Sequence, residues 1–232
     1  MELSAYLLTL DKPFTYDAYT LRNEVLTSSL NTEICSFIDG ENRWKVQYPR
    51  IHFTLLDEKP MIVSMNEAIE TTDSFVNQWD AFQIKGQTWH IQSVEIFHDY
   101  TRFEKTNAQY IYRFLTPWIG LNRQNFVHYK YLYAWERTAF LNKMLSQNIL
   151  FLMNDFGYQL TFKISCKIRL HGLTPTQHPE ISMGYFTGGF QSNIYLPDYL
   201  AMGCGISRGF GTIFCCDKSH PSKQSDIPSL EE

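Results

Sequence analysis

A glycine-rich segment near the C-terminus, MGCGISRGFGTI at residues 202–213, combines bare backbone with a serine and an arginine. Its glycines are Gly203, Gly205, Gly209 and Gly211. Glycine has no Cβ, so a ligand can approach the main chain closely. Successive N–H groups in such a turn can surround phosphate oxygens, with Arg208 and Ser207 beside them. The segment indicates contact with a phosphate-bearing ligand, and a plain tight turn is the alternative.

The spacing of these glycines excludes two familiar phosphate loops. The pattern is G-x-G-x-x-x-G, and too little chain follows it to build a βαβ unit around a dinucleotide. The Gly-Lys-Ser/Thr of a Walker loop is also missing. Cysteine and histidine show no zinc-ligand spacing. We therefore predict no cofactor and no metal site.

A second candidate contact is the strand-like segment YQLTFKISCKIRL at residues 158–170. Its alternation places Lys163, Lys167 and Arg169 on one face, with same-face neighbours about 6.6–7 Å apart. Such a row can follow a phosphate backbone and adds salt-dependent affinity without reading sequence. The alternative is the solvated outer face of an edge strand.

Charge is segregated along the chain. The net charge is −4, but residues 1–119 carry −6 and residues 120–216 carry +4. The later half could therefore face a polyanion. Arg123, Lys130 and the tyrosines of HYKYLY (residues 128–133) could join that surface, because aromatic rings stack on unpaired bases. Packing in the core is the alternative for those tyrosines.

Composition indicates an ordered protein. Its 232 residues are 44% hydrophobic and 16% aromatic, enough for two small domains or one large one. No apolar run is long enough for a transmembrane helix, and the N-terminus resembles a first strand rather than a signal peptide. Five cysteines without paired spacing suggest reduced thiols, and we expect a cytoplasmic protein without membrane association.

The hydrophobic periodicity of the first half predicts a β-α-β-β-α-β order, which is the ferredoxin-like arrangement. The expected elements are a strand at 3–10, a helix at 15–30, strands at 43–56 and 61–65, a helix at 66–79 and a hairpin at 81–97. Thr15 or Asp17 could cap the first helix. Lys85-Gly86 would form the turn of the hairpin.

The second half predicts another α+β unit. A strand begins it, and the strongest helix of the chain, 134–157, follows, with Gly157 as its stop signal. Further strands are expected in 158–170, 181–197 and 210–216.

Four segments together resemble the CRISPR-associated repeat-RNA endoribonucleases of the RAMP superfamily. They are YPRIHFTLLDEKPMIVSMNEA (48–68), YRFLTPWIGLNRQNF (112–126), LSQNILFLMNDFGY (145–158) and FQSNIYLPDYLAMGCGISRGFGTI (190–213). The resemblance implies an α+β fold of two tandem ferredoxin-like domains. We place them at 1–105 and 106–216, followed by a flexible tail at 217–232.

The resemblance also implies an activity, which is binding precursor CRISPR RNA at its repeat and cutting it there. The implied chemistry is metal-free attack of a ribose 2′-hydroxyl on the adjacent phosphate. It further implies that Arg22, within the first helix, contacts RNA. The sequence departs from the family pattern where a histidine is usual, in 31–47, and where Cys204 and Asn154 replace lysines.

Tyr48 and His52 lie near the expected site and could replace the missing histidine. If both belong to one extended strand, their four-residue separation puts them on the same face. Our catalytic hypothesis is His52 as general acid or base and Tyr48 as proton donor. The alternative for His52 is a packed strand residue.

Three functions remain open from the sequence. The first is an active repeat-RNA endoribonuclease with a rearranged site. The second is a degenerate relative that binds RNA or CRISPR effector subunits without cutting. The third is a scaffold subunit that needs no RNA, and a homodimer is compatible with each of them.

Overall fold

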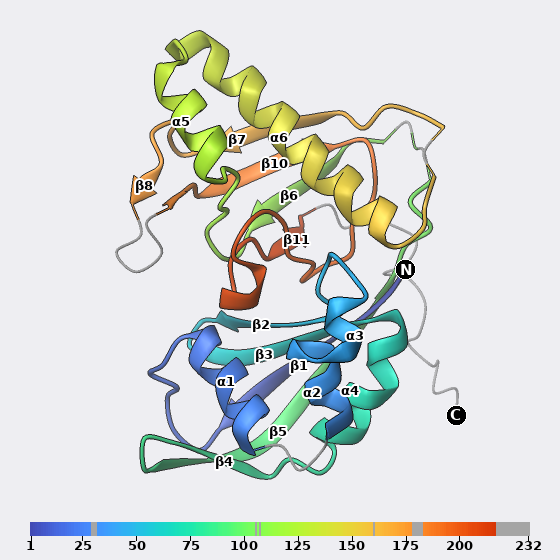
Figure 1. The fold of residues 1–232 in the computed structure, drawn as a ribbon, viewed down its shortest axis with the longest axis vertical. Coiled ribbons are helices and arrows are strands. Elements are labelled where there is room, and N and C mark those ends of the chain that lie inside the picture. The colour runs from blue at the N-terminus through green and yellow to red at the C-terminus, as the bar shows by residue number, and fades with distance from the viewer. Residues whose placement is uncertain (29–31, 105, 107, 160, 178–182, 217–232) are drawn as a thin grey trace, which may run out of the picture.

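A computed structural model places two α+β units one above the other along the long axis of the molecule (Figure 1). It describes residues 1–28, 32–104, 106, 108–159, 161–177 and 183–216. The tail expected at 217–232 lies outside the described residues. Within those ranges no helix is both long and apolar enough to cross a bilayer.

The N-terminal unit is built on a five-stranded antiparallel sheet in the order β2-β3-β1-β5-β4. Its strands are β1 (Glu2–Leu10), β2 (Ile51–Leu56), β3 (Lys59–Met65), β4 (Ala81–Ile84) and β5 (Gln87–Tyr100). Without β4, the order β2-β3-β1-β5 is that of a ferredoxin-like sheet, as the sequence predicts. The expected turn at Lys85-Gly86 is confirmed, with both residues at positive φ.

Helices cover one face of this sheet (Figure 1). They are α1 (Ala18–Ser28), α2 (Thr32–Asp39), α3 (Glu41–Trp44) and α4 (Ile69–Val76). Leu21 and Val25 of α1 pack with Tyr6 and Leu8 of β1 in one buried cluster. Asp17 caps α1, because its carboxylate accepts a hydrogen bond from the Thr20 N–H.

The C-terminal unit has a four-stranded sheet in the order β11-β6-β10-β7. Its elements are β6 (Tyr110–Phe114), α5 (Arg123–Tyr131), α6 (Ala134–Asp155), β7 (Cys166–Leu170), β8 (Thr176–Gln177), β9 (Gly184–Tyr185), β10 (Gly188–Ser192) and β11 (Ile213–Cys215). The sheet order again matches a ferredoxin-like unit. Where that fold has a second helix, between β10 and β11, this chain has the glycine-rich segment and one 3₁₀ turn (Ile206–Arg208).

The two units share a core. The face of the N-terminal sheet turned away from its helices contributes Leu3 and Val63 to the cluster that also contains Leu200 and Ile213. Hydrogen bonds cross the same boundary, for instance from the Thr101 hydroxyl to the Tyr195 carbonyl at 3.2 Å. The packing therefore holds the glycine-rich segment directly against the first domain.

Several parts of the sequence prediction are wrong in detail. Within the described residues of the strand expected at 158–170, only β7, Cys166–Leu170, forms. The stretch 43–50 is not strand, because α3 occupies its start and β2 begins only at Ile51. The sequence reading also missed α2 and α5. Both helices are short, and their apolar residues pack against neighbouring elements rather than forming a long periodic stripe.

Candidate nucleic-acid interface

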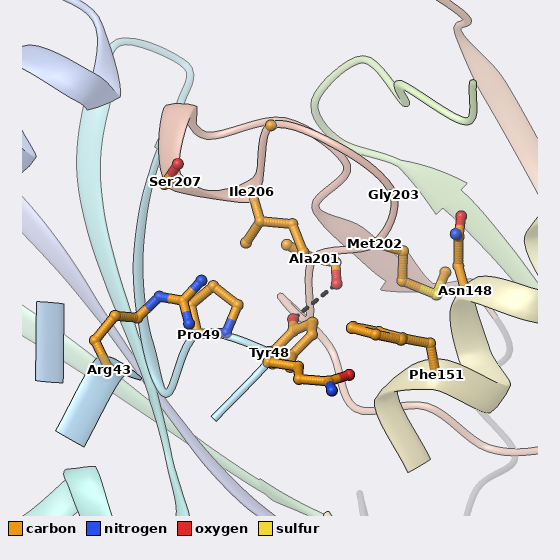
Figure 2. Close-up of a pocket in the computed structure, with 12 residues that line it drawn as sticks. Arg43, Tyr48, Pro49, Asn148, Phe151, Ala201, Met202, Gly203, Ile206 and Ser207 are labelled. Atoms are coloured by element: carbon orange, nitrogen blue, oxygen red, sulfur yellow. Dashed lines mark hydrogen bonds between the residues drawn. The ribbon is translucent and has the colours of Figure 1, made fainter. Parts of the chain in front are cut away.

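A pocket of about 220 Å³ lies where the two domains meet the glycine-rich segment (Figure 2). The residues before β2 form one wall, α6 forms another, and the glycine-rich segment forms the third. The lining residues are Arg43, Gln47, Tyr48, Pro49, Asn148, Phe151, Ala201, Met202, Gly203, Gly205, Ile206 and Ser207. Only Arg43 and Tyr48 among them carry ionisable side chains.

The glycine-rich segment turns tightly around its 3₁₀ turn. Gly205 and Gly209 flank the turn in the left-handed conformation, at φ +76° and +85°, which side chains with a Cβ rarely adopt. Several N–H groups donate within the protein, as Cys204 does to the Ile119 carbonyl at 2.8 Å. The N–H groups with no recorded acceptor among the described residues are those of Gly203, Gly205, Ile206 and Ser207. All four residues line the pocket, so the open donors and the cavity coincide.

Gly209 and Gly211 correct the sequence prediction that every glycine of the segment contacts RNA. Both are buried, and their N–H groups donate to the carbonyls of Ile206 and Pro117. A Cβ on Gly209 would lie 2.7 Å from the Cβ of Ala18. These two glycines serve close packing rather than ligand contact.

Arg43 reaches the pocket from α3, and its side chain extends toward Pro49 (Figure 2). Its Nη1 donates a 2.7 Å hydrogen bond to the Val46 carbonyl, which fixes the guanidinium. Partial burial lowers the pKa of Arg43, and the nearby positive charge of Arg22 lowers it further. A guanidinium held this way is a natural partner for a phosphate.

Arg22 and Arg208 lie on either side of the domain boundary around one ring. The guanidinium of Arg208 lies 4.9 Å from the centroid of Tyr19, and that of Arg22 lies 5.8 Å from it. Arg208 is exposed, and within the described residues no salt bridge is recorded for it. The Arg22 side chain is 12% exposed, donates to the Ile38 carbonyl and pairs with Asp39 at 3.4 Å. These contacts occupy its guanidinium within the first domain, and an RNA contact of Arg22 stays a prediction.

Tyr48 lines the pocket, but its hydroxyl is already engaged. It donates a 2.7 Å hydrogen bond to the Ala201 carbonyl, which leads into the glycine-rich segment (Figure 2). Burial raises the pKa of Tyr48 well above its usual value, so the phenol stays protonated at neutral pH. Tyr48 is thus a neutral donor that ties the two walls of the pocket together.

His52 does not line the pocket, and the structure does not support the catalytic role that the sequence suggests. The ring is buried in β2 beside the Tyr199 backbone. Burial lowers the pKa of His52 to about 4, although the Tyr199 backbone partly offsets this effect. Neither ring nitrogen has a well-formed hydrogen bond to a described residue. A substrate cannot reach this imidazole without opening the interface between the domains.

Asn148 and Phe151 are pocket residues that the sequence reading missed. They lie one turn apart on α6 and line the same wall (Figure 2). The Oδ1 of Asn148 is buried and has no hydrogen-bond partner among the described residues, whereas the Phe151 side chain is partly exposed. No local sequence signal separates them from the other polar and apolar residues of an amphipathic helix.

The basic row is exposed as predicted, but it lies apart from the pocket. Lys163, Lys167 and Arg169 alternate with buried or half-buried residues, and β7 is an edge strand. Lys163 precedes the strand. The apolar side of β7 packs against α6, so the row is on the face of the sheet turned away from α6. The structure brings Arg113 of β6 to that same face. Arg113 and Arg169 are both paired with Gly189 of the strand between them, and directly paired residues lie on one face of a sheet.

Comparison with known families decides the relationship. The model of the Cas6b N-terminal domain matches residues 1–102, and that of the Cas6b C-terminal domain matches residues 104–216. The chain belongs to the Cas6b family. The resemblance to CRISPR-associated endoribonucleases is therefore confirmed.

Solved structures agree with this Cas6b assignment. A crystal structure of Cas6b is 28% identical, with a TM-score of 0.78, and covers 93% of this chain and 100% of its own. A second, described as the CRISPR RNA processing endoribonuclease Cas6b, is 26% identical, with a TM-score of 0.69 and the same coverage of both chains. An uncharacterized protein of Methanocaldococcus jannaschii is 26% identical over 130 residues, which is 56% of this chain and 88% of that one.

The pocket of this Cas6b-family chain offers positive charge and hydrogen-bond donors. Four open N–H groups and the Arg43 guanidinium can surround phosphate oxygens, and Tyr48 is a neutral donor nearby. The pocket lining contains no imidazole, thiol or carboxylate. Across the described ranges, no three histidine, cysteine, aspartate or glutamate side chains form a cluster suited to a metal ion. The arrangement is suited to binding a phosphodiester and stabilising charge on it.

Proposed function

We propose that this Cas6b-family protein binds the repeat of precursor CRISPR RNA in the interdomain pocket and cleaves it there without a metal ion. The observation that carries the proposal is that one cavity is lined by Arg43, by Tyr48 and by four residues whose N–H groups have no acceptor in the described part of the chain. Such donors favour a phosphoryl group whose negative charge increases in the transition state. Family membership supports the same substrate class.

In the proposed reaction, the ribose 2′-oxygen forms a bond to the adjacent phosphorus and the bond from phosphorus to the 5′-oxygen breaks. The proton of the 2′-hydroxyl passes to water, because the pocket lining holds no side-chain base. The leaving 5′-oxygen takes a proton from Tyr48 or from water. The products are a cyclic 2′,3′-phosphate and a free 5′-hydroxyl.

Two groups have distinct roles in this proposal. Arg43 and the open N–H groups stabilise the crowded phosphoryl group. Tyr48 would exchange its hydrogen bond to the Ala201 carbonyl for one to the leaving oxygen, since its hydroxyl is the only neutral ionisable donor of the pocket lining. In the proposal the substrate is a cytoplasmic transcript, and the products are passed to CRISPR effector subunits.

A second candidate function is RNA binding without cleavage. The burial of His52 away from the pocket favours it, and so does the lack of a side-chain base in the pocket lining. In that case the same donors hold RNA, but nothing accelerates proton transfer. Binding and cleavage must therefore be measured separately.

The decisive experiment incubates the protein with labelled repeat RNA from its own locus and scores both retardation and cleavage. For the endoribonuclease, we expect cuts that persist in EDTA and disappear when the scissile nucleotide carries a 2′-deoxy group. Tyr48→Phe should reduce the cleavage rate about 100-fold or more if the phenol donates a proton. Retardation without cleavage would select the binding function, and no retardation at any salt concentration would exclude both.

A further inference from the structure

The junction of α5 and α6 exposes three large aromatic side chains, which we call the aromatic corner: Tyr131, Tyr133 and Trp135. Their exposed fractions are 83%, 71% and 77%. Folded proteins rarely leave three such rings in water within five residues unless they serve an interaction. The intervening Leu132 packs against the core instead, which fixes the backbone of the junction.

Two of the three rings of the aromatic corner lie parallel to each other. Tyr133 and Trp135 are parallel to within 4°, with centroids 6.4 Å apart. The large exposed fractions of all three side chains leave ring surface accessible to a ligand, and unpaired nucleobases stack on such rings whatever their sequence.

The charge around the aromatic corner favours a polyanion. Arg123, Lys130, Arg137 and Lys143 surround it in sequence. The one acidic residue among residues 122–143 is Glu136, and its carboxylate accepts the Tyr133 N–H at 2.9 Å at the start of α6. An acidic protein partner would also fit cations, but parallel exposed rings beside them are the combination used for single-stranded nucleic acid.

The exposed face of α6 connects the aromatic corner to the pocket. Phe151 lines the pocket near the C-terminal end of this helix, and Trp135 is in its first turn. The distance between them along the axis is about 24 Å at 1.5 Å per residue. Lys143 is exposed between them, and the only other acid of α6, Asp155, is paired with Arg50. No free carboxylate of α6 would repel RNA along this path.

We propose that the aromatic corner binds an unpaired segment of the substrate RNA that continues from the pocket along α6. This inference rests on the proposed function for the identity of the RNA. A stacked strand advances about 3.4 Å per nucleotide, so roughly seven nucleotides separate the two sites. The corner would add affinity without reading sequence.

The test compares a short repeat RNA around the cleavage site with the same RNA extended by unstructured uridines at the 5′ or the 3′ end. The number of added uridines is about twice the number of nucleotides estimated to separate the two sites. In the parent chain, one extension should tighten binding roughly 10- to 100-fold. The triple variant Tyr131→Ala, Tyr133→Ala, Trp135→Ala should lose that gain and bind the short RNA as before. Tyr100→Ala, which removes an exposed ring of the other domain, is the control.

The inference is overturned if neither extension tightens binding, or if the triple variant retains the full gain. Loss of binding to an effector protein with unchanged RNA affinity would also overturn it. If the parent chain binds neither RNA, the proposed function fails. Tryptophan fluorescence then tests separately whether the aromatic corner binds single-stranded RNA. The variant Trp44→Phe is used for this measurement, because Trp135 is then the one exposed tryptophan left and the others are buried. Polyuridine should quench its fluorescence, and unchanged fluorescence contradicts the inference.

Discussion

The guanidinium of Arg50 and the carboxylate of Asp155 form an ion pair of 2.6 Å between the first domain and the end of α6. Both side chains are nearly buried, at 6% and 8% exposure. Asp155 also accepts the N–H of Gln47 at 2.8 Å, and the Arg50 guanidinium lies 3.9 Å from the centroid of the Phe156 ring. This arrangement holds one wall of the pocket against another.

Removing Asp155 should be costly, because Arg50 is nearly buried and its other ion-pair partner in the described residues, Glu67, is half exposed. We expect Asp155→Ala to lower the free energy of unfolding by about 3 kcal/mol in urea titrations. Glu41→Ala is the matched control, since its pair with Lys45 is exposed and should matter little. Similar losses for both variants would contradict the assigned role.

Arg43 and Arg208 should contribute to RNA affinity through phosphate contacts. For Arg43→Ala and for Arg208→Ala, we expect weaker binding to every RNA sequence and a salt-dependence slope reduced by about one. Filter binding over a range of salt concentrations measures both. Lys85→Ala, in the turn between β4 and β5, should leave the slope unchanged, because this hairpin contributes no residue to the pocket lining. An unaltered slope in both arginine variants would separate these residues from RNA.

Gly209 should be required for domain packing rather than for ligand contact. Gly209→Ala would place a Cβ 2.7 Å from Ala18 and 3.2 Å from the carbonyl oxygen of Phe53. Gly86 has a similar positive φ, +81° against +85° for Gly209, but a Cβ there would have nothing within 4 Å, so Gly86→Ala isolates the backbone strain. We expect a loss of about 1 kcal/mol for Gly86→Ala, and ~1–3 kcal/mol more for Gly209→Ala. Thermal and urea unfolding would show the difference, and equal losses would refute it.

Burial of His52 should make stability depend on pH. The pKa of His52 is about 4 in the folded protein, below the ordinary value of 6.5, so the unfolded chain binds the proton more readily between these limits. The free energy of unfolding should therefore fall as the pH drops from 6.5 to 4, by up to about 1.4 kcal/mol per unit from this group. Above 6.5 this group adds no pH dependence.

Comparing unfolding of the parent chain with His52→Gln across that range measures the contribution. The variant should lose much of the slope, whereas His90→Gln, at an exposed position of β5, should retain it. Identical slopes in the parent chain and in His52→Gln would show that the imidazole is not buried as the structure has it.

Local signals predicted much of the fold. Alternation in β1, the Asp17 cap of α1, the Lys85-Gly86 turn and the long periodic helix α6 with Gly157 after it are all visible in sequence. Each depends on contacts between residues close in the chain. The glycine-rich segment was likewise recognisable as a tight turn, because glycine readily adopts the left-handed backbone conformation that Gly205 and Gly209 have there.

The composition of the pocket could not be derived in the same way. Arg43, Asn148 and Phe151 come from separate elements, and nothing in their local pattern sets them apart. The assignment of His52 failed for the same reason. Strand spacing places His52 on the same face as Tyr48 only if both residues belong to one strand, and Tyr48 lies outside β2. Spacing also carries no information that the second domain covers that face.

By itself, the sequence determined the two α+β units, the family and the position of the glycine-rich turn, since these follow from periodicity and from motifs within short segments. Only the tertiary structure decided which N–H groups of the turn lack an acceptor among the described residues, that Arg22 pairs with Asp39 and that His52 is buried. It also decided that the basic row of β7 lies on the other face of the sheet from α6. The reason is physical. Burial and the pairing of polar groups depend on which distant segments pack together, and a local pattern carries no record of that.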